Sequence, residues 1–245
     1  MRPIMILSCA LLVPLGVPAF AQSIALKPLR SLTFEVTYSL VSTSQRRVSG
    51  LARDNLVDPV VGSTSFSQSF GVDDSGTLKV EVVAATADRG LVVDVSYDGR
   101  KTKQAPLRVA ILPGGQLGYD LKHPICDQAA EVLPLLARGL LFDREIEEGA
   151  SWSDGFDGRV SEQRTYRVVR VSGTDATFEV ETNMRVRGPE GFEGHETGTL
   201  DYATDKQVPR RWDVLLRTHR DTADVNQVTD THLVATLTSD SFAKR

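Results

Sequence analysis

Residues 32–40 read Leu-Thr-Phe-Glu-Val-Thr-Tyr-Ser-Leu, and the alternation in this stretch decides the fold class. Every second residue is apolar, whereas the residues between them are polar. Successive side chains of a β-strand point to opposite faces, so this pattern predicts a strand with one buried face and one face in water. Such strands are typical of antiparallel sheets.

The same alternation returns along most of the chain. Strands are predicted near residues 45–51, 63–72, 78–82, 91–97, 107–111, 161–172, 177–187, 195–203, 208–220 and 226–239. Asp98-Gly99 is the strongest short hairpin signal, and 52–62 is predicted to be a loop. The turn 73–76 should separate two strands. The sequence therefore predicts a mainly β protein: a long curved antiparallel sheet, as a half-barrel or open barrel, formed by two meanders.

The pairing of two adjacent strands can be predicted from their residues. Placing Ser172 opposite Ala176 across the turn at 173–175 gives an apolar centre. The same register puts Arg167 opposite Glu181 on the other face. A slip of one residue would exchange the two faces, so this register is favoured.

One amphipathic helix is predicted between the two meanders, at about residues 124–142. Pro124 suits the first position of a helix. The apolar positions form one stripe: Ile125, Ala129, Val132, Leu133, Leu136 and Leu140. Pro134 lies inside the helix and predicts a bend toward the core. A break into two short helices is the alternative.

Residues 1–21 are typical of a secretory signal peptide. Arg2 is followed by an apolar stretch, and Ala19-Phe20-Ala21 supplies small residues before a cleavage site at Gln22. The apolar stretch is too short to span a membrane, and no later segment is long enough. We therefore expect an exported protein, periplasmic or extracellular, with a single antiparallel β domain over residues 22–245 and no transmembrane segment. Its mature part would hold one thiol, Cys126, which excludes an internal disulfide.

The charge balance bears on possible partners. The 245-residue chain carries a formal net charge of −4. This acidic balance argues against nucleic acid or an anionic membrane surface as the partner.

The densest group of reactive residues surrounds Cys126. His123 lies three residues earlier, and a thiol near a helix N-terminus with a neighbouring base can act as a nucleophile. His123, Cys126 and a carboxylate of Asp120 or Asp127 could instead bind a metal ion. The interpretation we favour is structural, with Cys126 as a small buried residue. We predict no catalytic residue, no metal site and no cofactor. The stretch 188–198 is interpreted as a Gly-rich hairpin loop, and His195, His219 and His232 as surface residues.

Two further stretches carry a resemblance. Residues 113–120 (Pro-Gly-Gly-Gln-Leu-Gly-Tyr-Asp) and 148–152 (Glu-Gly-Ala-Ser-Trp) resemble a loose group of bacterial exported β-rich proteins of unknown function. The resemblance covers about residues 90–240 and implies an exported β fold without indicating an activity. The expected architecture is also similar to the half-barrel carriers of lipoproteins in the periplasm, although architecture does not fix function.

These observations favour an exported, non-catalytic envelope protein that binds a lipid or other apolar small molecule, or an envelope protein, in the hollow of its sheet. The predicted ligand-binding residues are Val132, Leu133, Leu136, Leu140, Phe178, Val180 and Trp212. If the helix fills the hollow, the protein is instead a structural or protein-interaction module. A thiol enzyme at Cys126 is the third hypothesis.

Overall fold

The structure is a computed structural model. It describes residues 29–46, 66–86, 90–120, 122–137, 146–158, 160–188, 191–222 and 224–242. The prediction of a signal peptide over 1–21 and of a loop at 52–62 lies outside these residues.

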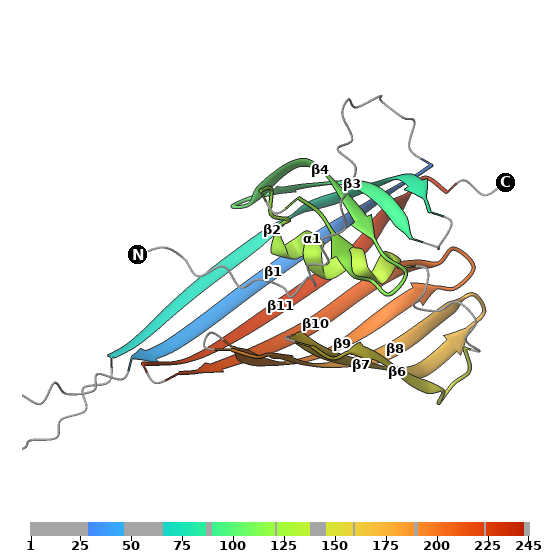
Figure 1. Ribbon diagram of the computed structural model, residues 1–245. Coiled ribbons are helices and arrows are strands. Elements are labelled where there is room, and N and C mark those ends of the chain that lie inside the picture. Colours follow the sequence, from blue (N-terminus) through green and yellow to red (C-terminus); the bar gives the residue numbers. More distant parts are fainter. Residues whose placement is uncertain are drawn as a thin grey trace, which may run out of the picture.

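Eleven strands and one short helical segment make up the described chain (Figure 1). The elements are β1 (Arg30–Arg46), β2 (Phe66–Ala85), β3 (Leu91–Gly99), β4 (Lys103–Ile111), β5 (Leu117–Gly118), α1 (Asp127–Val132), the 3-10 helix η1 (Leu133–Leu136), β6 (Ser151–Phe156), β7 (Val160–Ser172), β8 (Asp175–Val186), β9 (Phe192–Ala203), β10 (Val208–Asp221) and β11 (Val225–Asp240).

All strands belong to one antiparallel sheet with the order β5-β4-β3-β2-β1-β11-β10-β9-β8-β7-β6. The first and last strands pair in the middle of the sheet, and each meander runs outward to one edge. The sheet is curved and open, and α1 lies in its hollow (Figure 1). This arrangement confirms the predicted fold class.

The alternation seen in the sequence separates the two faces of the sheet. Inward-facing residues such as Phe34, Val80 and Val95 are at most 1% exposed and form one hydrophobic core with α1 and η1. The outer face is polar and carries cross-strand ion pairs such as Arg217–Asp230 and Arg108–Asp94. The outer face is therefore suited to water, as the sequence predicted.

The predicted turn at 73–76 is wrong, because these residues lie within β2. Asp74 points inward and is only 4% exposed. Its carboxylate accepts hydrogen bonds from the backbone N–H groups of Ser75, Lys101 and Thr102 at 2.9–3.0 Å. Burial opposes ionisation of Asp74, but these bonds outweigh it and hold its pKa below the ordinary value. The acidic residue thus fastens the β3–β4 hairpin to β2.

The presence of a glycine at position 76, in the middle of β2, also has a structural reason. A Cβ atom at Gly76 would lie 2.4 Å from the carbonyl oxygen of Asp98 and 2.4 Å from Cα of Gly99. Both contacts are with backbone, which cannot move aside easily. The Asp/Gly composition that resembled a turn therefore permits a close approach between β2 and the end of β3.

The predicted register of β7 and β8 has the wrong partners, and its faces are correct only for the β7 residues up to Val168. Ser172 lies opposite Asp175, and a β-bulge between Val168 and Arg170 shifts the pairing by one more residue. Arg167 therefore pairs with Glu179, not with Glu181. A two-residue turn and a bulge each displace the register by one, so together they preserve the face of each β7 side chain up to Val168.

The predicted helix at 124–142 is also corrected. The α-helix begins at Asp127 and ends at Val132, and a 3-10 turn continues it to Leu136. Pro134 lacks an N–H group and cannot extend the α-helical bonding, so the chain tightens into a 3-10 turn and leaves the helix at Ala137. The alternative prediction, a break into two short helices, agrees better with this structure. Residues 138–142 lie outside the described part of the chain.

Two smaller outcomes complete the comparison with the predictions. β9 begins at Phe192, so most of the stretch 188–198 is strand, not loop. In the described ranges, no helix combines the length and apolar character needed to cross a membrane.

Candidate functional site

Six of the predicted ligand-binding residues come together in the structure. Val132, Leu133, Leu136, Phe178, Val180 and Trp212 all belong to one hydrophobic core and are at most 5% exposed. Leu140 lies outside the described residues. Val132, Leu133 and Leu136 belong to α1 and η1 themselves, so the helical segment contributes to the core and occupies this part of the hollow.

Burial becomes uneven in the next inward row along the strands, where buried and half-buried residues occur together. Directly paired residues of antiparallel strands share a face, so they form rows across the sheet. One such row contains Tyr38, Leu233, Val214, Gly198 and Val180, and its four residues with side chains are at most 5% exposed. The next inward row crosses six strand pairs: Val72, Leu40, Thr231, Leu216, Glu196, Thr182 and Arg164. This second row mixes apolar, polar and charged side chains.

A charged cluster stands at the β7 end of that row. The Arg164 Nε atom donates a hydrogen bond to Thr182 Oγ1 at 2.9 Å, and Thr182 Oγ1 donates to Glu196 Oε1 at 2.8 Å. Arg164 Nη2 lies 3.5 Å from Glu196 Oε1 and 3.6 Å from Glu162 Oε1. Glu196 is 1% exposed and Thr182 is fully buried. One guanidinium group therefore lies close to two carboxylates in a largely buried site.

The helix adds two more carboxyl groups. The Tyr38 hydroxyl donates to Asp127 Oδ2 at 3.4 Å. Burial raises the pKa of Glu131 to about 8, and the neighbouring carboxylate of Glu196 contributes to the same effect. Burial likewise raises the pKa values of Asp127 and Glu162. Among the described residues, the cluster has more carboxyl groups than cations, which favours the protonated forms of the acids.

The pKa of Arg164 is raised as well, which for a guanidinium favours the charged form. Burial alone would lower it, but the adjacent Tyr166 and the carboxylates of Glu196 and Glu162 hold the pKa above its ordinary value. Arg164 thus stays charged, and it interacts with Glu162 on β7, Thr182 on β8 and Glu196 on β9.

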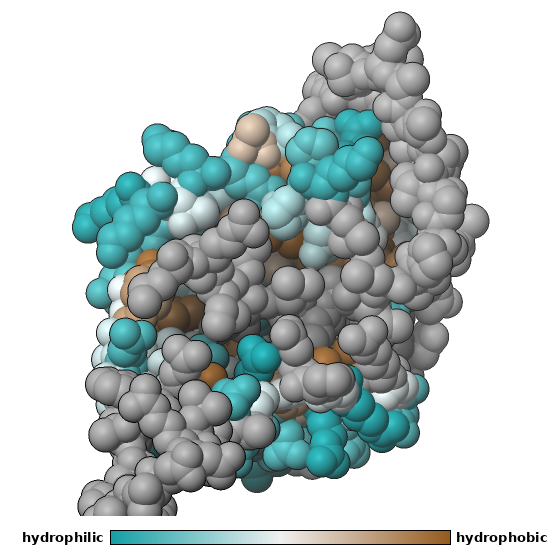
Figure 2. Space-filling model, turned by 60° about the vertical axis from the view of Figure 1, so that its left-hand side comes forward, coloured by the Kyte–Doolittle hydropathy of each residue, from teal (hydrophilic) through white to brown (hydrophobic). Residues whose placement is uncertain are grey.

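Beyond this cluster the concave face is half-buried. We call this surface the distal hollow and define it by its half-buried, inward-facing apolar side chains: Leu40, Val72, Val160, Met184, Val186 and Leu216. Thr229 and Gln227 bond with Ser42 on the same face. Figure 2 shows hydrophobic residues recessed between hydrophilic margins of the molecule. The distal hollow therefore offers apolar contact area beside hydrogen-bonding groups.

The surroundings of Cys126 do not favour a nucleophile. Burial raises the pKa of the Cys126 thiol to about 11, and the nearby carboxylate of Asp127 opposes the thiolate further. His123 is exposed, and its Nδ1 atom lies 3.5 Å from Asp120 Oδ2. The backbone N–H of Cys126 donates to Gln104 Oε1 at 2.7 Å, which anchors the start of α1 to β4. A reactive thiol needs a lowered pKa, and this one is raised.

The other histidines lie on the outer face, as predicted. His195, His219 and His232 are exposed, and His232 Nε2 lies 2.9 Å from Asp213 Oδ1. Within the described ranges, no group of three or more His, Cys, Asp or Glu side chains is placed to hold a metal ion.

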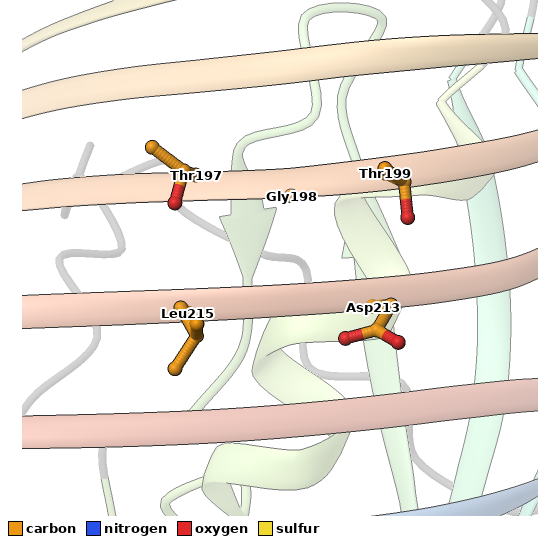
Figure 3. Close-up of a pocket in the computed structure, with 5 residues that line it drawn as sticks. All are labelled: Thr197, Gly198, Thr199, Asp213 and Leu215. Carbon is orange, nitrogen blue, oxygen red and sulfur yellow. The ribbon is translucent and has the colours of Figure 1, made fainter.

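A shallow depression of about 310 Å³ lies on the outer face between β9 and β10. Figure 3 shows the side chains of Thr197, Thr199, Asp213 and Leu215 around Gly198, with the helix behind the strands. Asp213 already accepts hydrogen bonds from Arg211 and interacts with His232. The depression is open, and its only charged group is engaged, so it is a weak candidate.

Sequence reasoning missed the charged cluster, although one signal pointed to it. Glu162 and Arg164 share the parity of the buried Tyr166, and Glu196 shares that of the buried Leu200. Charged residues at inward positions of a strand are unusual, because burial of a charge is costly unless it is paired. Their convergence required the register of β7, β8 and β9.

The fold and site define this protein as an open antiparallel half-barrel with a helical segment seated in its hollow. Among known proteins, the chain matches no family model and no curated sequence.

Proposed function

We propose that this chain is an exported, non-catalytic envelope protein that binds an amphipathic molecule, such as a lipid, in the distal hollow. The observation that carries the proposal is the change from a filled core to a half-buried, mixed surface along the concave face. Binding sites for small molecules are concave and mostly apolar, with a few polar groups that orient the ligand.

The predicted ligand-binding residues suggest a site directly beneath the helix, but their side chains contact one another there. In the distal hollow, the apolar side chains on the concave face keep some exposed area. An apolar ligand placed on Leu40, Leu216 and Met184 would remove this area from water. Each 100 Å² of apolar surface buried in this way contributes about 2.5 kcal/mol.

The polar groups at the inner end of the distal hollow favour an amphipathic ligand over a purely apolar one. Arg164 and Glu162 are half-buried, and Arg164 lies in the same row as Leu216, three strands away. A ligand with a hydrogen-bonding end group would place that group here and its apolar part along the strands.

Native mass spectrometry of protein purified from its own host tests both parts of this proposal. We expect a polypeptide mass that begins at Gln22, together with a population carrying an additional non-covalent mass that organic solvent removes. A polypeptide that retains residues 1–21 in the mature pool would contradict export. A single ligand-free mass under gentle conditions would contradict binding.

Two adjacent residues allow a matched test of where the ligand binds. Leu216 points into the distal hollow, whereas Leu215 is 55% exposed on the outer face. We expect Leu216→Gln to weaken binding of a fluorescent fatty acid about tenfold or more, because an amide on the apolar row loses contact area and must be desolvated.

Leu215→Gln is the control and should leave the dissociation constant unchanged within about twofold. Thermal unfolding of both variants checks that each is folded. Equal effects of the two substitutions, or no effect of either, would exclude the distal hollow as the binding surface.

A further inference from the structure

One half of β2 has a free edge. β2 pairs with β1 along most of its length, whereas on its other side the pairing with β3 begins only at Gly76. The β3–β4 hairpin ends at this point, where the N–H of Arg100 donates to the carbonyl oxygen of Ser75 at 3.1 Å. In the described part of the chain, no strand lies on this side of residues 67–73, which we call the free edge. β2 thus extends beyond the hairpin as a margin of the sheet (Figure 1).

The free edge presents both backbone groups and an aromatic ring. Because the carbonyl of Ser75 points away from β1, the backbone N–H and C=O groups of every second residue before it do so as well. These residues are Ser67, Ser69, Gly71 and Asp73. Phe70 is 58% exposed, and it lies on the concave face because it pairs with Ser42. Residues 67–71 are all exposed, so the free edge is open to another chain.

The free edge also lacks the features that protect other strand edges. Natural edge strands are short or carry charges, prolines or bulges that prevent pairing with another chain. β5 has two residues, and the six-residue β6 carries Asp154. The part of β4 that β5 leaves unpaired carries Lys103, Pro106 and Arg108. By contrast, residues 60–72 contain no charge and no proline, and β2 pairs with β1 without a bulge.

The sequence of the free edge is complementary to itself. A two-fold axis through its middle residue, Phe70, would align all seven residues antiparallel with those of a second copy. Phe70 would then face its own counterpart, and Ser69 would face Gly71. Asp73 would face Ser67, so a carboxylate meets a hydroxyl group and no like charges are opposed. A register centred on Asp73 would instead oppose two carboxylates, which is unfavourable.

We propose that two copies of this chain pair antiparallel through the free edge of β2, with Phe70 at the two-fold axis, and form one continuous sheet. The two edges would exchange up to about eight backbone hydrogen bonds, and the two aromatic rings would leave water together. An axis perpendicular to the sheet puts both concave faces on the same side, so the two distal hollows adjoin. The contact is smaller than a standard stable interface, so we expect a dissociation constant of about 10–100 μM.

Sedimentation velocity of the purified protein tests the dimer. We expect the wild type to change from monomer to dimer between about 1 μM and about 1 mM. Phe70→Lys would place two like charges at the axis and should weaken dimerisation at least about tenfold. Leu215→Lys is the matched control, because Leu215 has a similar exposure of 55% but lies on β10, which is paired on both sides. This control should dimerise like the wild type.

A proline at position 69 tests the backbone hydrogen bonds. The N–H of Ser69 faces the free edge, so the monomer does not need it as a donor to β1. Proline is tolerated on an edge strand when its missing N–H faces solvent, and Ser69→Pro should therefore unfold at nearly the wild-type temperature. The same substitution removes a donor at the centre of the proposed contact. We expect it to weaken dimerisation at least about tenfold.

Disulfide cross-linking tests the register. Phe70 would form a non-hydrogen-bonded pair across the axis, with Cα atoms about 4.5 Å apart, which suits a disulfide. In a Cys126→Ser background, Phe70→Cys should give a covalent dimer on oxidation, whereas Leu215→Cys should stay monomeric.

A wild-type chain that stays monomeric at every concentration, including one that carries an extended peptide of another protein at this edge, would overturn the inference. Dimerisation that neither Phe70→Lys nor Ser69→Pro weakens would also overturn it. None of these measurements needs a ligand, so failure here is distinguishable from failure of the proposed function.

Discussion

Arg164→Met is expected to lower the free energy of unfolding by about 3–5 kcal/mol, because removal of one partner leaves buried charge without compensation. Glu196, at 1% exposure, would lose its ion pair, and Thr182 would lose the donor to its hydroxyl oxygen. The measurement is urea denaturation at pH 7, followed by intrinsic fluorescence.

Arg167→Met on the same strand is the control for this substitution. Arg167 lies on the outer face, where it pairs with Glu179 and is 60% exposed. Loss of this ion pair should lower the free energy of unfolding by less than about 1 kcal/mol, as for other surface ion pairs. The double variant Arg164→Met with Glu196→Gln should recover part of the lost stability, since it also removes the unpaired charge. Equal costs at Arg164 and Arg167 would show that the buried cluster has no special role.

Trp212→Ala is expected to lower the free energy of unfolding by about 3–5 kcal/mol, because it leaves a cavity in the core. Trp212 is 2% exposed, and its ring lies across Gly198 on β9. A Cβ atom at Gly198 would stand 3.2 Å from Trp212 Cη2, so the glycine provides the space for the ring. Thermal unfolding of the two proteins measures the difference.

Trp212→Phe separates packing from hydrogen bonding at this position. In the described part of the chain, the buried Trp212 Nε1 atom has no hydrogen-bond partner. Phenylalanine retains most of the apolar contact and loses no bond, so it should cost markedly less than alanine. Leu215→Ala on the outer face should change stability by less than about 0.5 kcal/mol. A phenylalanine variant as unstable as the alanine variant would mean that the indole N–H is bonded after all.

Local patterns predicted the fold well where each residue's role depends on its neighbours in the chain. The alternation at 32–40 correctly assigned Phe34 to the core and Glu35 to the outer face. It failed at 73–76, where Asp74 and Gly76 have turn-like composition but serve long-range contacts with the β3–β4 hairpin. Composition alone does not distinguish a glycine in a turn from a glycine that admits a neighbouring backbone.

The candidate site was predicted in part. The apolar stripe of the helix and the inward rows of β8 and β10 do share one hydrophobic core, which includes Leu133, Phe178 and Trp212. The charged cluster was missed, because Arg164, Thr182 and Glu196 become neighbours only through the register of three strands. A bulge at 168/170 shifts that register by one residue, and no pattern within β7 announces it.

The sequence by itself determined that this chain forms a one-sided antiparallel sheet, because a period of two residues leaves an extended chain one way to hide its apolar side chains. The tertiary structure decided how far the core extends along that sheet. Pro134 ends the helical segment early, bulges set which strand residues face it, and Arg164 meets Glu162 and Glu196 beside the apolar core. Those contacts join residues far apart in the chain, so only the folded molecule brings them together.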